Sequence, residues 1–137
     1  MKRSIFLAMV ILLVAAFAVA KPPVTPISQD DLKDLNGMWT GERLGQRGGL
    51  EKIDLKINND SIPLKGEVTL HWEERGIASK TWPCKGHIED GRLIFLWAKQ
   101  SRKLDLGLRK DDGSMELEGQ ITDKGFQGTV FLKKRQE

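Results

Sequence analysis

Residues 117–132, LEGQITDKGFQGTVFL, contain the clearest structural signal in this chain: two strands joined by a turn. Every second residue is apolar or glycine on both sides of the turn 122–125, and this period of two is typical of strands with one buried face. Gly119 and Gly128 both fall on the apolar face. Since glycine weakens a strand interior, these two positions require a structural reason.

The same alternation continues through most of the chain, and turn residues separate the segments. Asp90-Gly91 and Asp112-Gly113 are hairpin signals, because glycine supplies the positive φ of such turns. Trp82-Pro83 interrupts 77–89, which is either two strands or one bent strand. We therefore expect an all-β, antiparallel meander of about eight strands. They span about 36–43, 50–57, 64–73, 77–82, 84–89, 92–99, 103–109, 114–122 and 126–134, which makes nine if 77–89 is two strands and eight if it is one.

A five-residue pattern, apolar-x-Gly-x-apolar, occurs five times, always with the glycine on the face of its apolar neighbours. A sheet that curls into a small barrel crowds its inner face, and a missing side chain permits the bend. The pattern therefore favours a closed barrel; the alternative is that some of the 14 glycines share this register by chance. Its glycines are Gly37, Gly66, Gly86, Gly119 and Gly128.

The first 34 residues differ in composition from the rest. Residues 1–20 combine a basic start, an apolar run and the small-residue ending Ala18-Val19-Ala20, which is typical of a secretory signal peptide; an uncleaved membrane anchor is the alternative. Residues 21–34 form a proline-rich linker and one short helical turn at about 29–34, with Ser28 and Asp31 as a capping box. Residues 35–134 are the barrel domain.

Cysteine content and charge restrict the environment and the partners. Cys84 is the only cysteine, so an internal disulfide is excluded, and we expect a periplasmic or secreted protein whose core alone stabilises it. Without residues 1–20 the chain keeps 20 of its 22 basic residues against 19 acidic ones, which argues against nucleic acid as a partner. No membrane association is expected after cleavage. Asn59 begins a short glycosylation-like triplet in a turn, a weak pattern that leaves modification open.

A resemblance appears at the start of the first expected strand. Leu35-Asn36-Gly37-Met38-Trp39 follows a helical turn and resembles the Gly-x-Trp opening of the calycin group, the lipocalins and avidin-like barrels. The resemblance implies a meander barrel in which Trp39 closes one end. Many lipocalins also hold a small apolar ligand, so the resemblance implies a binding protein.

Catalytic and metal-binding patterns are weak. Cys84 and His87 are three apart on an extended segment, so they should point to opposite faces and form no nucleophile–base dyad. Two histidines and one cysteine give no convincing zinc set. We therefore expect no enzymatic activity, no catalytic residues, no metal and no cofactor.

Two surfaces are candidates for binding. The first is the barrel interior, where four aromatic residues could line a pocket for a small apolar ligand; the alternative is that they fill the core. The second is Leu93–Ala98, LIFLWA, which is apolar on both faces and must be covered by the N-terminal segment or by another chain. The second feature predicts a protein-interaction module or a homodimer that uses Ile94 and Leu96. The candidate ligand-binding residues are Trp39, Trp72, Phe95 and Trp97.

Overall fold

The computed structural model describes residues 23–45, 48–58, 63–72, 76–99, 101–111 and 113–135. The expected signal peptide and Asn59 lie outside these ranges. A short 3-10 helix, η1 (Gln29–Asp31), and a helical turn, α2 (Leu32–Leu35), precede eight strands. The strands are β1 (Gly37–Leu44), β2 (Leu50–Asn58), β3 (Leu64–Trp72), β4 (Ile77–Glu89), β5 (Arg92–Trp97), β6 (Arg102–Asp111), β7 (Ser114–Asp123) and β8 (Phe126–Lys134).

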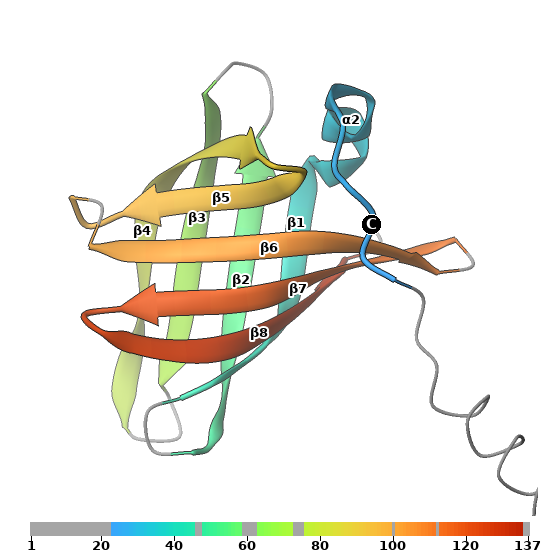
Figure 1. Cartoon of the computed structure of the whole chain (residues 1–137). Helices are drawn as coiled ribbons and strands as arrows, with labels where there is room; N and C mark the ends of the chain where they lie inside the picture. Colours follow the sequence, from blue (N-terminus) through green and yellow to red (C-terminus); the bar gives the residue numbers. More distant parts are fainter. Residues whose placement is uncertain are drawn as a thin grey trace, which may run out of the picture.

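The strands form a closed antiparallel barrel in which each strand pairs with its neighbours in sequence. β8 returns to β1 through the register Trp39↔Lys134 to Arg43↔Val130, which closes the barrel. In Figure 1, β1 to β3 run behind β5 to β8 and cross them at a steep angle. The all-β meander of eight strands is therefore confirmed.

Residues 77–89 form one long strand rather than two. β4 pairs with β3 along almost its whole length but with β5 only from Lys85 to Glu89. Pro83 stands opposite Glu67 of β3, at a position where β4 has no neighbour on its other side. A residue without an N–H can occupy such a position without removing a ladder hydrogen bond, so the strand continues through the proline.

Four of the five pattern glycines stand where a side chain could not fit. A Cβ atom at Gly119 would lie 1.8 Å from the Asp105 carbonyl oxygen, and one at Gly128 would lie 2.4 Å from the Leu44 carbonyl oxygen. At Gly86 a Cβ would lie 2.6 Å from the Phe95 ring, and Gly66 faces the same ring at 3.2 Å. Neighbouring backbone or an aromatic ring thus occupies the space of the missing side chains, as expected for a tightly curled sheet.

Two glycines depart from this expectation. Gly37 has open space around it, with the nearest atom 3.7 Å away, but its φ of +123° is a conformation that other residues rarely adopt. Gly41 is not part of the pattern, yet a Cβ there would lie 1.7 Å from the Phe131 carbonyl oxygen. Where β8 closes the barrel against β1, Gly41 is therefore the position that has no room for a side chain.

One end of the barrel is closed by the helical turn, which lies at the upper right of Figure 1. Leu35 at the end of α2 and Trp39 on β1 are both fully buried, and the Trp39 indole N–H donates a 2.9 Å hydrogen bond to the Leu35 carbonyl. The Ser28 backbone N–H donates to the Asp31 carboxylate, and the Lys110 ammonium also donates to it. The bond from Lys110 is the main reason why the pKa of Asp31 lies below its ordinary value.

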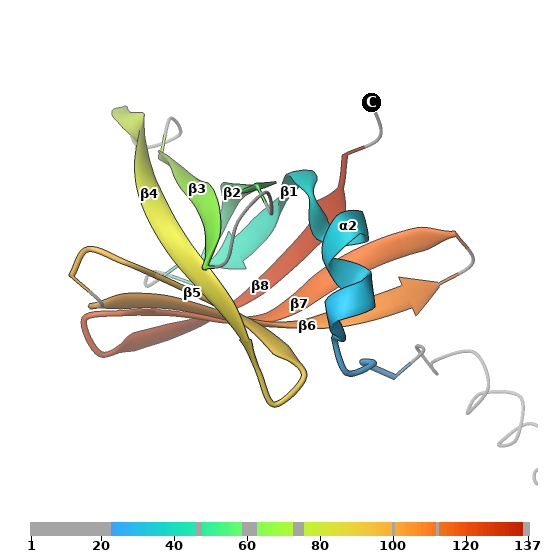
Figure 2. The ribbon, with the colours of Figure 1, turned by 90° about the horizontal axis from the view of Figure 1, so that it is seen from above.

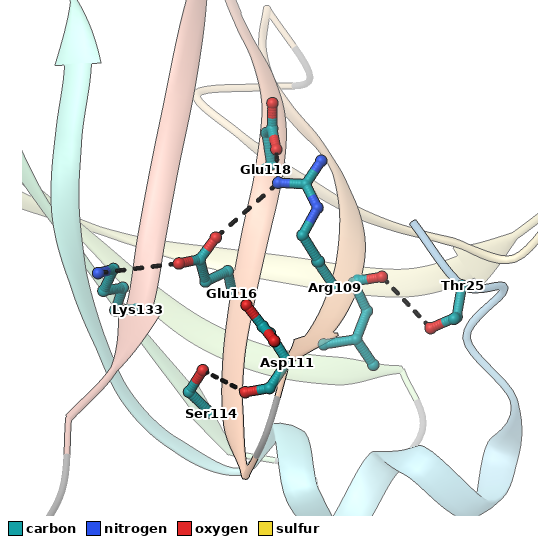
Figure 3. Close-up of polar contacts among 8 residues, drawn as sticks. Thr25, Arg109, Asp111, Ser114, Glu116, Glu118 and Lys133 are labelled. Atoms are coloured by element: carbon teal, nitrogen blue, oxygen red, sulfur yellow. Dashed lines mark hydrogen bonds and ion pairs between the residues drawn. The ribbon is translucent and has the colours of Figure 1, made fainter. Parts of the chain in front are cut away.

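The N-terminal segment before η1 lies along the outside of the barrel. The Thr25 N–H donates to the Leu108 carbonyl at 2.8 Å, and the Ile27 N–H donates to the Gly91 carbonyl at 2.9 Å. Figure 3 shows Thr25 beside β6, near ion pairs that join β6, β7 and β8 on the outer face. In these pairs Arg109 contacts two glutamates and Lys133 contacts one of them, Glu116.

Candidate functional site

The end opposite α2 lies at the lower left of Figure 1. Polar and aromatic side chains gather there. Here β1, β3, β5 and β7 end and β2, β4, β6 and β8 begin. Inward-facing positions near the strand ends bring together a group that we call the open-end cluster. Its members are Arg43, Glu51, Trp72, Trp82, Arg102 and Asp123.

A buried ion pair forms one side of the open-end cluster. Arg43 and Glu51 stand opposite each other on β1 and β2, and Arg43 Nη2 donates to Glu51 Oε2 at 2.7 Å. Their side chains are only 8% and 10% exposed. The Trp72 indole N–H donates to the same carboxylate at 3.0 Å, and the Arg43 guanidinium lies 5.9 Å from the Trp72 ring centroid. Multiple hydrogen bonds and a cation–π contact offset the cost of burying these charges.

The other side of the cluster repeats this chemistry. The Arg102 guanidinium lies 4.8 Å from the ring centroid of Trp82, and Arg102 Nε donates to Asp123 at 3.0 Å. Trp82 meets Trp72 edge to face, with centroids 6.1 Å apart. Six side chains from six strands are therefore linked in one continuous chain of contacts. Packing between charges and rings holds these side chains in fixed orientations.

A pocket of about 300 Å³ opens in this end of the barrel. Trp72, Ile77 and Phe126 supply its apolar wall, and Ile77 is 48% exposed. Arg43 also lines it, and within the described part of the chain its buried Nε finds no hydrogen-bond acceptor. The Arg43 guanidinium is a hydrogen-bond donor without acceptor capacity, so an oxygen of a bound molecule is the group that it could contact. In the described ranges its lining consists of Arg43, Glu51, Trp72, Ile77, Lys80, Asp123 and Phe126.

The four aromatic residues expected to line a ligand site are divided between different parts of the barrel. Trp39 and Phe95 are fully buried in the core, and neither lines the open-end pocket. Trp72 lines that pocket. Trp97 is 3% exposed, and its indole N–H has no acceptor among the described residues. Binding by all four together stays a prediction, and Trp72 alone of them lies in the open-end pocket.

The buried core fills the rest of the interior. Inward-facing leucine, isoleucine and valine side chains from β2, β3 and β5 to β8 join Trp39 of β1, Cys84 of β4 and Phe95 of β5 in one cluster, and most of them are 0–3% exposed. Such packing leaves the strand ends as the accessible part of the barrel interior.

Cys84 and His87 lie on opposite faces of β4, as the spacing predicted. Cys84 is buried, and burial raises the pKa of its thiol to about 12, with the charge of Glu67 adding to the effect. His87 is exposed and pairs with Glu89 at 3.2 Å. His71, on β3, instead contacts Asp54 at 2.7 Å on the outer face. Within the described ranges no three histidine, cysteine, aspartate or glutamate side chains are grouped so that they could hold a metal ion.

A second, larger pocket of about 690 Å³ lies on the outer face of β2 to β5. Leu96 of the LIFLWA segment and Pro83 form part of its wall, and four lysines surround them. Ile94, the other expected contact residue, is only 5% exposed, with His87 and Asp105 as its cross-strand neighbours. Val24 of the N-terminal segment lies against Gly107 of β6, and the Arg92 side chain of β5 lies beside the same glycine. We call this pocket the lysine groove; its lysines are Lys56, Lys65, Lys85 and Lys99.

Comparisons with known proteins give information on the fold alone. No family model matches the chain, and no curated protein matches it. Among solved structures, it is similar to a redesigned β-barrel, with 12% sequence identity and a TM-score of 0.55. That match covers 77% of this chain and 95% of the redesigned barrel. None of the helices in the described ranges is long and apolar enough to cross a membrane.

Proposed function

We propose that this chain is an exported, non-enzymatic binding protein that holds a small apolar ligand at the open end of its barrel, in the manner of a lipocalin. The observation that carries the proposal is the open-end pocket, where Trp72, Ile77 and Phe126 face a common space beside the buried Arg43. A few apolar walls with one or two oriented polar groups are typical of small-molecule sites.

The size and chemistry of the pocket define the ligand. A volume of about 300 Å³ stands at the lower limit for ligand pockets, which favours a single ring or a short chain. The Arg43 guanidinium in the lining favours a ligand that also carries an acceptor oxygen. The closed end supports the calycin resemblance, since Trp39 is buried and bonded to the helical turn. Export rests on the signal-like residues 1–20, and a cleaved N-terminus at Lys21 in periplasmic or culture fractions would support it.

A titration with short-chain fatty acids and small aromatic acids tests the proposal. Because Trp72 lines the pocket, we expect its fluorescence to change on binding. Phe126→Ser should weaken binding about tenfold, because it removes one apolar wall. Phe131→Ser is the matched control: Phe131 is on the same strand but 44% exposed on the outer face. Absence of a response across the panel, or equal weakening by both variants, would contradict the proposal.

A second candidate function is protein interaction through the LIFLWA segment. Leu96 supports it, because this apolar side chain is partly exposed and lines the lysine groove. A homodimer through this surface should dissociate in sedimentation experiments when Leu96 is replaced by glutamate. A protein that is monomeric before and after the change would argue against the homodimer.

A further inference from the structure

The first half of β4 is a strand edge that no other strand of the described chain covers. β4 pairs with β5 only over Lys85–Glu89, because β5 ends at Trp97 and the chain turns away at Ala98 and Lys99. Residues 77–84 therefore have β3 on one side, and none of the described strands pairs with them on the other. In Figure 2, β4 diverges from β5 along this half. Alternate residues of such an edge present backbone N–H and C=O groups that another strand can pair with.

The lysine groove adjoins this edge. Pro83, Cys84 and Lys85 of β4 line one of its sides, and Leu96, Trp97 and Lys99 line another. An added strand would therefore continue the line of β5 beyond the point where β5 ends. Its side chains would face Leu96 and Pro83 on the outer surface.

The charge around the edge selects the partner. Among the described residues, the lining of the lysine groove contains four lysines and one glutamate, Glu67, and all five side chains are exposed. Lys80 adds a further positive charge on the free half of β4. A second copy of this chain would bring the same lysines together, which is unfavourable, so the charge favours a different protein over the homodimer considered above for this surface. A segment with alternating acidic and apolar residues would place carboxylates near the lysines and apolar side chains against Leu96 and Pro83.

We propose that the free edge of β4, over residues 77–84, and the lysine groove bind an extended acidic segment of a partner protein by strand addition. Backbone hydrogen bonds to β4 provide affinity, and the lysines select acidic side chains, as in other proteins that recognise peptides by adding a strand. Lys80 also disfavours pairing of this edge with the same edge of a second copy, because it would bring like charges together. The lysine groove shares no residue with the open-end pocket, whose lining includes Ile77 and Lys80 of the free edge, so the proposal does not depend on a ligand in that pocket.

The first experiment titrates the purified protein into a fluorescent peptide, acetyl-(Glu-Val)₄-amide, at low salt and follows the anisotropy. We expect binding that weakens about tenfold in the double variant Lys85→Glu/Lys99→Glu, since both lysines line the groove. The matched control, Lys33→Glu/Lys133→Glu, changes the net charge equally, but neither of its positions lines the groove. The peptide (Lys-Val)₄ should not bind. Failure of (Glu-Val)₄ to bind, or equal weakening by both variants, would overturn the proposal.

The second experiment separates strand addition from simple charge attraction. Two versions of (Glu-Val)₄ carry N-methyl groups on alternate backbone amides, one on the glutamates and one on the valines. An added strand bonds to β4 through one set of amides, so one version should lose binding and the other should keep it. If both versions bind equally well, the attraction is electrostatic only and the proposal fails. A protein that sediments as a dimer, with the amides of β4 protected from exchange in the absence of peptide, would assign the edge to a second copy and also refute it.

Discussion

Replacing Gly119 by alanine tests whether the absence of a side chain at this position allows the sheet to curl. The added Cβ would lie 1.8 Å from the Asp105 carbonyl oxygen and 3.0 Å from the Leu106 Cα, whereas ordinary contacts begin near 3.4 Å. All the nearest atoms belong to the backbone of β6, paired with β7 at this point, so no side chain can rotate away. One strand has to move relative to the other.

The size of the effect follows from this overlap. Overpacking of a core costs about 1–3 kcal/mol, and a backbone contact that cannot relax belongs at the upper end, about 3 kcal/mol or more. For a domain of this size, this loss corresponds to a Tm about 12 °C lower.

Two other glycines provide matched controls. Gly49 has no atom within 4 Å of its Cβ position and no positive φ, so Gly49→Ala should be neutral or stabilising by about 0.5 kcal/mol. Gly113 also has open space but a φ of +83°, so Gly113→Ala should cost about 1 kcal/mol. Chemical denaturation of the three variants separates crowding from backbone conformation. If Gly119→Ala is no more destabilising than Gly113→Ala, the crowding argument is wrong.

Three further predictions concern other parts of the barrel. At pH 8 the Cys84 thiol, whose pKa is raised to about 12, should react with iodoacetamide about a thousandfold more slowly in the folded protein than in urea. The contribution of the buried neutral thiol to the free energy of unfolding is complete below pH 9 and is lost as the pH rises toward 12. Cys84→Ala should remove this pH-dependent loss. Trp39→Phe should lower the free energy of unfolding by about 3 kcal/mol in denaturant titrations, because the buried Leu35 carbonyl loses its donor; a loss below 1 kcal/mol would argue against that role. Ala98→Gly should raise the same free energy by about 0.5–1 kcal/mol, because Ala98 has a φ of +52°, and a destabilised variant would contradict this.

Much of the barrel could be predicted from the sequence because local patterns determine it. The alternation in 126–134 gave the bounds of β8 directly, since the residues on either side of the strand are turn and terminal residues. Pro83 could not be assigned, because its effect depends on whether β4 has a neighbour on both sides, and this is set by where β5 ends. Gly41 was missed because Arg43, and not an apolar residue, follows it on the same face.

The open-end cluster was mostly beyond the reach of sequence reasoning. Arg102 and Asp123 are 21 residues apart, as are Glu51 and Trp72, so only the strand register brings them together. Charged residues at strand ends also look like ordinary solvent-exposed positions. One signal was available: Arg43 and Glu51 continue the apolar face of β1 and β2, where a charged pair at facing positions is unusual.

The four tryptophan indole N–H signals in a ¹⁵N-correlated spectrum report directly on ligand binding at the open end. Trp72 lines the pocket and Trp82 packs against it, whereas Trp39 is buried beneath the helical turn at the closed end. During titration with small aromatic or short-chain fatty acids, the signals of Trp72 and Trp82 should shift in proportion to occupancy while that of Trp39 stays in place. A shift of Trp39 with Trp72 and Trp82 unmoved, or four signals that never move, would contradict the account.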